Sequence, residues 1–574
     1  MLINKRARIL MSILVLANVA SAADIAVSLP VQDQVNYLGK INVNPLLKNQ
    51  AGVIYAEERN LAKDLQIESI VKYFDCQTMA GAAFLEAALR LPVSPKSGCH
   101  TVARRQHAIA TIAAKPELKA RLDALLAAVK DAELDLAVLL SPEFRGASCP
   151  EEKELELLQA TKNPAYPIRN FIVKNCIGNS VGMGINLIGT AGSAYATYLM
   201  GRGNYAAYKA GNLSGKAVGW NAYMAVAGGL VGYQVAKDYV NAYKKRNKMH
   251  AINKLINVAE EFELLCVENG IEPQFKMTDI ANENSLSLIA ELKKSRYSKA
   301  RSYVFFTPKV HTFLYEIYEK DGGLADILAC VAELDAYNAI ATKLVGSQGQ
   351  ANKFCLANFI NSPKAVINAT GFWNVLVDQE KAVANNLYEA KNIILSGDNA
   401  GGKTTGTRSI LQNIVLAQTF GVAAAISFEF TPFDIIHSYL NISDDLINGN
   451  SLFVSEVNRA KEIKEKIVSI DGTDLKFFFA LDELFTGTSS EAGEECACAF
   501  VDRIATANGV MFIYPTHFDK LKKLGDSHDN CINYKVGNAV KRADGSLIYP
   551  FTISQGASYH NVAMDIANHA NLFN

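Results

Sequence analysis

Eight consecutive residues in the C-terminal half combine glycines with one lysine and one hydroxyl: Gly397-Asp398-Asn399-Ala400-Gly401-Gly402-Lys403-Thr404. They fit the pattern G-x4-G-K-[ST] without a mismatch, between a strand-like run over 392–396 and a helical pattern. Glycines let successive backbone N–H groups face phosphate oxygens, and a helix N-terminus adds a positive dipole end. The stretch therefore predicts a phosphate-binding loop rather than a chance glycine-rich turn.

Two side chains of this loop have separate predicted roles. Lys403 supplies a mobile cation for the β and γ phosphates of ATP, and Thr404 offers its hydroxyl to Mg²⁺. We therefore expect ATP and Mg²⁺ as the ligands. The loop residues expected to contact the nucleotide are Gly397, Asn399, Gly401, Gly402, Lys403, Thr404 and Thr405.

A second apolar strand-like run, Phe477–Glu483, ends in a pair of acids. A carboxylate at the C-terminal end of a parallel strand lies where ligands bind in such sheets. Asp482 is predicted to hold Mg²⁺ with Thr404, directly or through water, and Glu483 to orient or deprotonate the attacking water. Alone, such a pair is more often a helix cap, and the phosphate loop about 80 residues earlier favours the metal site.

A third strand-like run ends at His517, in VMFIYPTH. At that position a histidine can contact the γ-phosphate or Glu483, so we place His517 with Glu483 among the catalytic candidates. The alternative is a histidine on a surface loop.

The elements that must position these residues are read from the periodicity of the apolar residues. From about residue 365, the runs NIILSG, AAAISF, KFFFALDE and GVMFIYPTH alternate with helical patterns, which predicts a parallel sheet with crossover helices. Upstream, long stretches carry apolar residues at helical spacing.

The predicted fold is an α-helical core and lever domain followed by a C-terminal α/β P-loop (ABC-type) ATPase domain. The expected divisions are a signal-like segment (1–22), a loosely ordered segment (23–65), a helical core (66–169), a glycine-rich apolar hairpin (170–239), a helical lever (240–364) and the ATPase domain (365–574).

The first residues have the layout of a secretory signal peptide, with a basic start, an apolar run from Ile9 to Val19 and Ala20-Ser21-Ala22. The alternatives are an uncleaved membrane anchor or an apolar helix on a cytosolic protein. Export would place an ATPase where ATP is scarce, so the localisation is left open.

The hairpin over 170–239 also has two interpretations. Glycines recur every fourth residue, as in Gly211-x3-Gly215-x3-Gly219, which lets helices approach closely in membranes. The run Ile177–Met200 is long enough to span a bilayer. Asparagines such as Asn186 and Asn221 favour a tightly packed hairpin outside the membrane.

Composition excludes few functional classes. The 574 residues, enough for roughly three to four domains, carry 57 basic and 57 acidic side chains. The net balance gives no support to a strongly basic nucleic-acid binder. None of the ten cysteines forms a C-x-x-C pair, so no zinc framework is expected. Cys496 and Cys498 are interpreted as helix packing residues rather than a redox couple.

The order of the motifs resembles the MutS family, the ABC-type ATPases of DNA mismatch repair. The phosphate loop is followed by DDLINGNSLFVSEV (Asp444–Val457), LDELFTGTSS (Leu481–Ser490) and PTHFDKL. The resemblance implies a homodimer, or a dimer with a related subunit, with composite ATP sites, in which Ser451 reaches the nucleotide of the opposite subunit. It also implies that Gly487-Thr488-Ser489 lines the subunit boundary and that double-stranded DNA is a partner.

The resemblance is strong over 365–574 and looser over 65–165, and it has departures. Asp398 and Ala400 stand where the family has proline and methionine, and a carboxylate at position 398 is electrostatically unfavourable beside phosphates unless it points away. We expect no N-terminal mismatch-reading domain. The apolar hairpin stands where the family has its DNA clamp, so the candidate DNA-binding face is Lys244-Lys245-Arg246-Lys248, whose alternative is a solvated or membrane-flanking charge cluster.

The leading functional prediction is a MutS-like ATPase whose ATP-dependent binding of (mismatched) DNA serves mismatch repair or a related DNA transaction. One rival is a membrane-associated, ATP-driven dimeric scaffold that does not bind DNA. The other is a nucleotide-dependent dimerisation switch without turnover.

Overall fold

The computed structural model describes residues 58–140, 250–277, 323–398, 401–440, 452–470, 472–542 and 546–560. The chain divides into two compact units, and the second unit comprises Asn42–Ala127, Glu261–Phe275 and Ala329–Asn574. Most described residues, and all the candidate site residues that the structure describes, belong to this second unit. The account below concerns its elements, three of which, over 116–140, 250–269 and 323–346, extend into residues of the first unit.

Helices make up the N-terminal part of the described chain: α4 (Glu58–Leu65), α5 (Ile67–Phe74), α6 (Met79–Arg90), α7 (Pro95–Ala114), α8 (Pro116–Leu140), a helical stretch over 250–269 and α18 (Gly323–Gly346). Pro95 lies in the first turn of α7, where its missing N–H costs no hydrogen bond. The first of these helices, α4, lies within the segment 23–65 that the sequence predicts to be loosely ordered. Glu58–Leu65 forms a helix because Leu61 and Leu65 bury their side chains at helical spacing.

A six-stranded sheet forms the centre of the C-terminal part, in the order β14-β11-β5-β10-β9-β8. The strands are β5 (Asn392–Ser396), β8 (Ile435–Tyr439), β9 (Phe477–Leu481), β10 (Val510–Pro515), β11 (Cys531–Val536) and β14 (Ile553–Gln555). All neighbours are parallel except β14, which pairs antiparallel with β11. β5 and β9 are buried along their whole length, as expected of strands covered on both faces.

One predicted strand does not belong to this sheet. The run AAAISF is split between β6 (Val422–Ala423), which pairs with β1 (Cys355–Leu356), and β7 (Ser427–Phe430). β7 lies in a separate four-stranded sheet with β2 (Asn358–Phe359), β3 (Ile367–Phe372) and β4 (Asn385–Glu389). Burial alternates along β7, which is typical of a strand with one covered face and not of the central parallel sheet. A short hairpin, β12 (Val540–Lys541) and β13 (Leu547–Ile548), completes the strands in the described residues.

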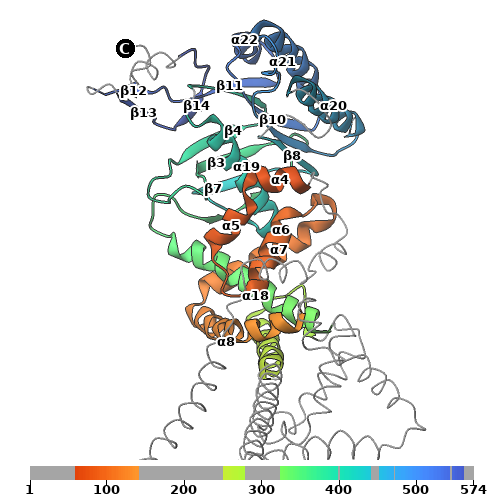
Figure 1. The fold of residues 1–574 in the computed structure, drawn as a ribbon, viewed down its shortest axis with the longest axis vertical. Helices are drawn as coiled ribbons and strands as arrows, with labels where there is room; N and C mark the ends of the chain where they lie inside the picture. Colours follow the sequence, from red (N-terminus) through yellow and green to blue (C-terminus); the bar gives the residue numbers. More distant parts are fainter. Residues whose placement is uncertain are drawn as a thin grey trace, which may run out of the picture. The chain divides into compact units, whose positions relative to one another are not determined.

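Helix α19 (Lys403–Phe420) links the helices to the sheets. It contacts α4, α6 and α7 as well as β3, β9 and β10 (Figure 1). Its residues from Ser409 to Phe420 are all buried. Two of its buried amides bond to other segments: Gln418 Nε2 donates to Val93 O at 2.9 Å, and Asn413 Oδ1 accepts from Ala424 N at 2.6 Å. A buried polar group without a partner costs free energy, so these bonds fix the register of α19.

Three further helices are α20 (Leu452–Ile470), α21 (Ser490–Ala505) and α22 (Asp519–Ser527). α21 contacts β10 and α22 contacts β11, whereas α20 contacts α21 and is bonded to the edge strand β8 through Glu462 and Tyr439 (Figure 1). Their apolar side chains share one core cluster with β9 and β10, in which the rings of Phe479 and Phe512 stack at 5.2 Å. Cys496 and Cys498 are free thiols on α21 that pack against this cluster, so their interpretation as helix packing residues is confirmed.

The structure therefore contains helices followed by mixed α/β sheets, in agreement with the coarse fold prediction. The lever arrangement and the remaining domain divisions stay predictions. The signal-like segment 1–22, the hairpin 170–239 and the basic cluster 244–248 lie outside the described residues. Among the helices that the structure does describe, none combines the length and apolarity needed to cross a membrane.

Candidate functional site

The predicted phosphate loop connects the centre of the parallel sheet to α19. β5 lies between β10 and β11, and the chain leaves it at Gly397 and enters α19 at Lys403. Gly402 precedes the helix with φ of +97°, where a Cβ would also lie 2.9 Å from the Phe551 ring. Glycine is the residue that adopts this backbone conformation without a steric penalty.

The ammonium of Lys403 lies under the loop. Its side chain is buried, and Nζ donates to Gly397 O at 3.1 Å and to Asp398 O at 3.3 Å. Nζ is also 3.7 Å from Glu483 Oε1. Burial lowers the pKa of Lys403, and the charges of Glu483 and Asp482 oppose that shift. The loop thus holds a largely desolvated cation against carbonyl oxygens and carboxylates.

Thr404 and Asp482 meet directly: Thr404 Oγ1 donates to Asp482 Oδ2 at 3.0 Å. Asp482 follows β9 and Thr404 follows β5, and β10 lies between these two strands. Because the three strands are parallel, their C-terminal ends meet at one edge of the sheet. Burial raises the pKa of Asp482 to about 6, although the Thr404 hydrogen bond acts in the opposite direction.

Glu483 and His517 form the second pair of the site, with 3.0 Å between Glu483 Oε1 and His517 Nε2. Burial alone would raise the pKa of Glu483, but the His517 hydrogen bond and the nearby positive charges, including Lys403, lower it overall. A carboxylate that stays ionised at neutral pH can accept a proton from water. His517 Nε2 is also 2.8 Å from Lys403 Nζ, so the three side chains form one cluster.

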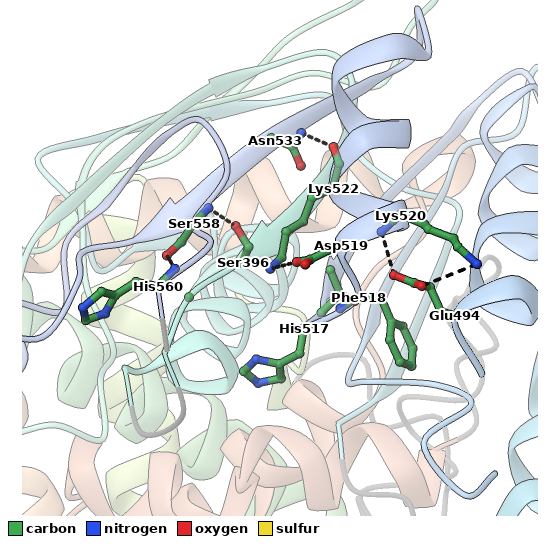
Figure 2. Close-up of polar contacts among 12 residues, drawn as sticks. Ser396, Glu494, His517, Phe518, Asp519, Lys520, Lys522, Asn533, Ser558 and His560 are labelled. Carbon is green, nitrogen blue, oxygen red and sulfur yellow. Dashed lines mark hydrogen bonds and ion pairs between the residues drawn. The ribbon is translucent and has the colours of Figure 1, made fainter. Parts of the chain in front are cut away.

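The segment that carries His517 is fixed where it enters α22. Figure 2 shows His517 followed by Phe518 and Asp519, with the amide of Lys520 bonded to Glu494. Phe518 N donates to Thr516 Oγ1 at 3.0 Å, and Lys520 N donates to Glu494 Oε1 at 2.6 Å. These bonds to the turn and to α21 hold the backbone on the C-terminal side of His517.

Asp398 points away from the site. Its side chain is completely buried; Oδ2 accepts from Ala539 N at 2.9 Å, and Oδ1 lies 2.9 Å from His560 Nδ1. Its charge is therefore directed to the C-terminal segment, which removes the expected conflict with phosphates. That segment is bonded to β5 as well, since Ser558 N donates to Ser396 Oγ at 2.8 Å (Figure 2).

His560 and Ser558 were missed in the sequence, because 162 residues separate each from its partner, Asp398 or Ser396. Neither carries a local motif.

The structure thus brings Gly397, Lys403, Thr404, Asp482, Glu483 and His517 together. Thr405 is exposed, and its carbonyl accepts from Ser409 Oγ at 2.7 Å within α19. Gly401 closes the loop by donating its N–H to Asp398 O at 3.0 Å. Asn399 and Ser451 lie outside the described residues, so their predicted roles stay predictions.

The residues present fit Mg²⁺ and a nucleoside triphosphate. Mg²⁺ prefers oxygen ligands, keeps several waters and is commonly held by one or two protein groups together with phosphates. The Thr404 hydroxyl and the Asp482 carboxylate match that kind of oxygen ligand. The buried Lys403 ammonium beside them is suited to phosphate oxygens. In the part of the chain that the structure describes, no group of three or more His, Cys, Asp or Glu side chains could hold a metal ion alone.

Comparison with known proteins identifies the relatives of this region. Residues 393–574 match the family model of MutS domain V. The DNA mismatch repair protein MutS of Fusobacterium nucleatum is 29% identical over 175 residues, which are 30% of this chain and 19% of the relative. For MutS of Shouchella clausii the identity is 29% over 180 residues, 31% of this chain and 20% of the relative. MutS of Pelotomaculum thermopropionicum is 29% identical over 184 residues, 32% of this chain and 20% of the relative.

The resemblance to the MutS family is therefore confirmed for the C-terminal part of the chain. The matched stretch spans about one fifth of the length of these curated relatives. The range that matches MutS domain V includes every residue of the candidate site described in this subsection.

Proposed function

We propose that this chain, whose residues 393–574 match the MutS domain V model, is a MutS-like ATPase that binds Mg²⁺ and ATP at the end of β5. The observation that carries the proposal is the meeting of two pairs at one sheet edge. Thr404 lies 3.0 Å from Asp482, and Glu483 lies 3.0 Å from His517, with Lys403 beside them. No single segment of the sequence holds all five residues.

Each side chain has one role in this proposal. Backbone amides of the loop and the Lys403 ammonium bind the phosphates. Thr404 Oγ1 and Asp482 hold Mg²⁺, which when bound neutralises negative charge on phosphate oxygens. Glu483 Oε1 accepts a hydrogen bond or a proton from the attacking water, and His517 keeps that carboxylate in place.

The ammonium of Lys403 also has acceptors within the loop itself. In the structure Lys403 Nζ donates to the carbonyls of Gly397 and Asp398. Phosphate oxygens are stronger acceptors for an ammonium than neutral carbonyls are. The proposal therefore expects Lys403 to exchange these carbonyls for phosphate when ATP binds.

The assembly proposed is a dimer with two composite ATP sites. Lys403, Thr404, Asp482, Glu483 and His517 act in their own subunit, and Ser451 acts on the nucleotide of the partner. Support comes from the family match, because Gly449-Asn450-Ser451 and the residues after it lie within the matched range. Opening and closing of the dimer would move the long helices, which is a common outcome of nucleotide binding.

The first experiment compares steady-state ATP hydrolysis by the full chain with that of Lys403→Ala. Loss of the buried ammonium should lower kcat/KM by at least about 100-fold, as expected when a charged group that binds phosphate is removed. Lys523→Ala, an exposed lysine on α22, is the matched control and should leave turnover unchanged. Equal turnover by Lys403→Ala and the wild type would contradict the proposal.

Double-stranded DNA is the proposed partner, because the similar proteins are named DNA mismatch repair proteins. Fluorescence anisotropy with matched and mismatched duplexes, with and without ATP, measures this. Binding that weakens steeply with salt would indicate phosphate contacts by lysines and arginines. An anisotropy that does not rise with either duplex at low salt, in any nucleotide state, would refute DNA as the partner. The ATPase proposal would remain intact.

A further inference from the structure

The turn after β9 has an unusual backbone. We call residues 482–487 the acid turn, because it begins with Asp482 and Glu483. Glu483 has φ of +38° and Phe485 has φ of +70°, and neither is glycine. Side chains at positive φ are costly, and such conformations persist only where the surroundings fix them. The orientation of the proposed general base therefore depends on what holds this turn.

Two contacts hold its middle. Phe485 is buried in the core cluster of α20 and α21, and Leu484 O accepts from Tyr514 Oη at 3.1 Å. Both anchor the turn to the sheet and helices behind it. They act on Leu484 and Phe485 and leave the end of the turn free to be fixed by other groups.

Glu456 fixes that end. It lies on α20 and is only 1% exposed. Its Oε1 accepts from Thr486 N at 3.0 Å and from Thr486 Oγ1 at 3.1 Å, and its Oε2 accepts from Gly487 N at 3.1 Å. All three donors come from the acid turn, so the carboxylate is fully engaged by that one segment. A carboxylate can be buried in this way because these hydrogen bonds replace the ones it would make with water.

Close packing also ties the same two segments together, in part through the backbone of Phe453. A Cβ on Gly487 would lie 2.6 Å from Phe453 N and 3.1 Å from Glu456 Oε2. Real side chains do not approach so closely, so only glycine allows the acid turn to lie against the first turn of α20. The two segments are therefore held together by hydrogen bonds and by close packing.

We infer that Glu456 is a positioning residue that couples the two ATP sites of the dimer. It fixes the turn carrying Glu483, which serves its own subunit's site, to the beginning of α20, which directly follows Ser451 in the sequence. Glu456 lies about one helical turn, ~6 Å, from the first residue of α20. The inference rests on the proposed function, because it assumes that Ser451 acts on the partner's nucleotide.

The chemistry of the site predicts what glutamine would do at this position. Glu456→Gln keeps the size of the side chain but turns one acceptor oxygen into an N–H₂ group. That group would face N–H or O–H donors of Thr486 or Gly487 that no longer have an acceptor. The acid turn and α20 would then separate or shift, without removal of any group proposed to touch ATP.

A mixed dimer isolates the effect on the partner's site. One subunit carries Glu483→Gln and one affinity tag; the other is wild type with a second tag; tandem purification yields the mixed dimer. Only the wild-type subunit's site can turn over, and it depends on the α20 segment of the Glu483→Gln subunit. Glu456→Gln is then added to the Glu483→Gln subunit alone.

The expected result is a 10- to 100-fold fall in turnover per mixed dimer, the loss expected when a hydrogen-bonded charged group is removed. Binding of a non-hydrolysable ATP analogue should stay unchanged. Glu465→Gln, the same change at an exposed position of α20, should have no effect. Gly487→Ala in place of Glu456→Gln provides a second route to the same loss if Glu456→Gln does not fold.

Turnover equal to that of the parent mixed dimer, with either Glu456→Gln or Gly487→Ala present, would overturn the inference. A role in folding alone would lower the melting midpoint of the altered subunit and leave the partner's turnover unchanged. A parent mixed dimer without hydrolysis would instead remove the proposed function, and the inference with it.

Discussion

Replacement of Glu483 by glutamine perturbs the proposed chemical step with little change elsewhere. Glu483 Oε1 is 3.0 Å from His517 Nε2 and 3.7 Å from Lys403 Nζ. Glutamine has nearly the same shape and can still accept a hydrogen bond from His517. It cannot take a proton from water, and it carries no charge.

The magnitude follows from those differences. A positioned general base contributes about 10²- to 10⁴-fold to a rate, so kcat should fall by that factor, about 3 to 5 kcal/mol in activation free energy. ATP affinity should not decrease, because the Lys403 ammonium loses a competing anion near the phosphates. The variant therefore separates binding from turnover.

The assay combines phosphate release at saturating ATP with titration of a fluorescent ATP analogue. Glu429→Gln, on β7, is the matched control for a change from glutamate to glutamine outside the site. Turnover of Glu483→Gln within about threefold of the wild type would refute the assignment of Glu483 as the base, since a lost base costs at least about 100-fold.

Two further predictions concern groups around the site and the sheet. Asp398→Ala leaves Ala539 N and His560 without their acceptor, so urea denaturation should show a loss of about 1 to 3 kcal/mol in the free energy of unfolding; no loss would mean that the pair is not formed. Burial and the charge of Lys466 lower the pKa of His437 to about 3 from 6.5, so the unfolded chain binds the extra proton and stability falls as the pH drops through 6.5. From pH 7.5 to pH 5 that group alone should cost about 2 kcal/mol, and His437→Phe should show a correspondingly smaller decrease; identical decreases would disprove the shift.

The strands that carry the site were predictable because their signals are local. β5 and β9 are unbroken apolar runs. The observed bounds of β5 equal the predicted run over 392–396, and β9 ends at Leu481, just before the two acids that the predicted strand over 477–483 included. Parallel strands bring their C-terminal ends to one edge, so the meeting of Thr404 with Asp482 followed from the strand order and the motif.

Other parts of the sheet were hidden in the sequence. β8 carries His437 and Ser438, two polar residues that are buried, so it does not resemble a core strand. The run AAAISF resembles one, but it is split between two other sheets. Which sheet an apolar run joins depends on the packing around it rather than on its composition.

The contacts that support the site were equally out of reach. Asp398 and His560 are 162 residues apart, and Glu456 and Gly487 are 31 residues apart. Each pair depends on how the C-terminal segment and α20 fold back, which no spacing rule determines. Asp398 was identified as a departure from the family pattern, but only the structure shows where its carboxylate points.

The central claim is that Lys403, Thr404 and Asp482 together bind the phosphates and metal of ATP. Isothermal titration calorimetry with a non-hydrolysable ATP analogue, with Mg²⁺ and then with excess chelator, measures it directly. The account predicts one binding event per chain that weakens when Mg²⁺ is removed, and whose dependence on Mg²⁺ is reduced in Asp482→Asn. Absence of binding by the wild type, or equal affinity in Mg²⁺ and chelator, would contradict it.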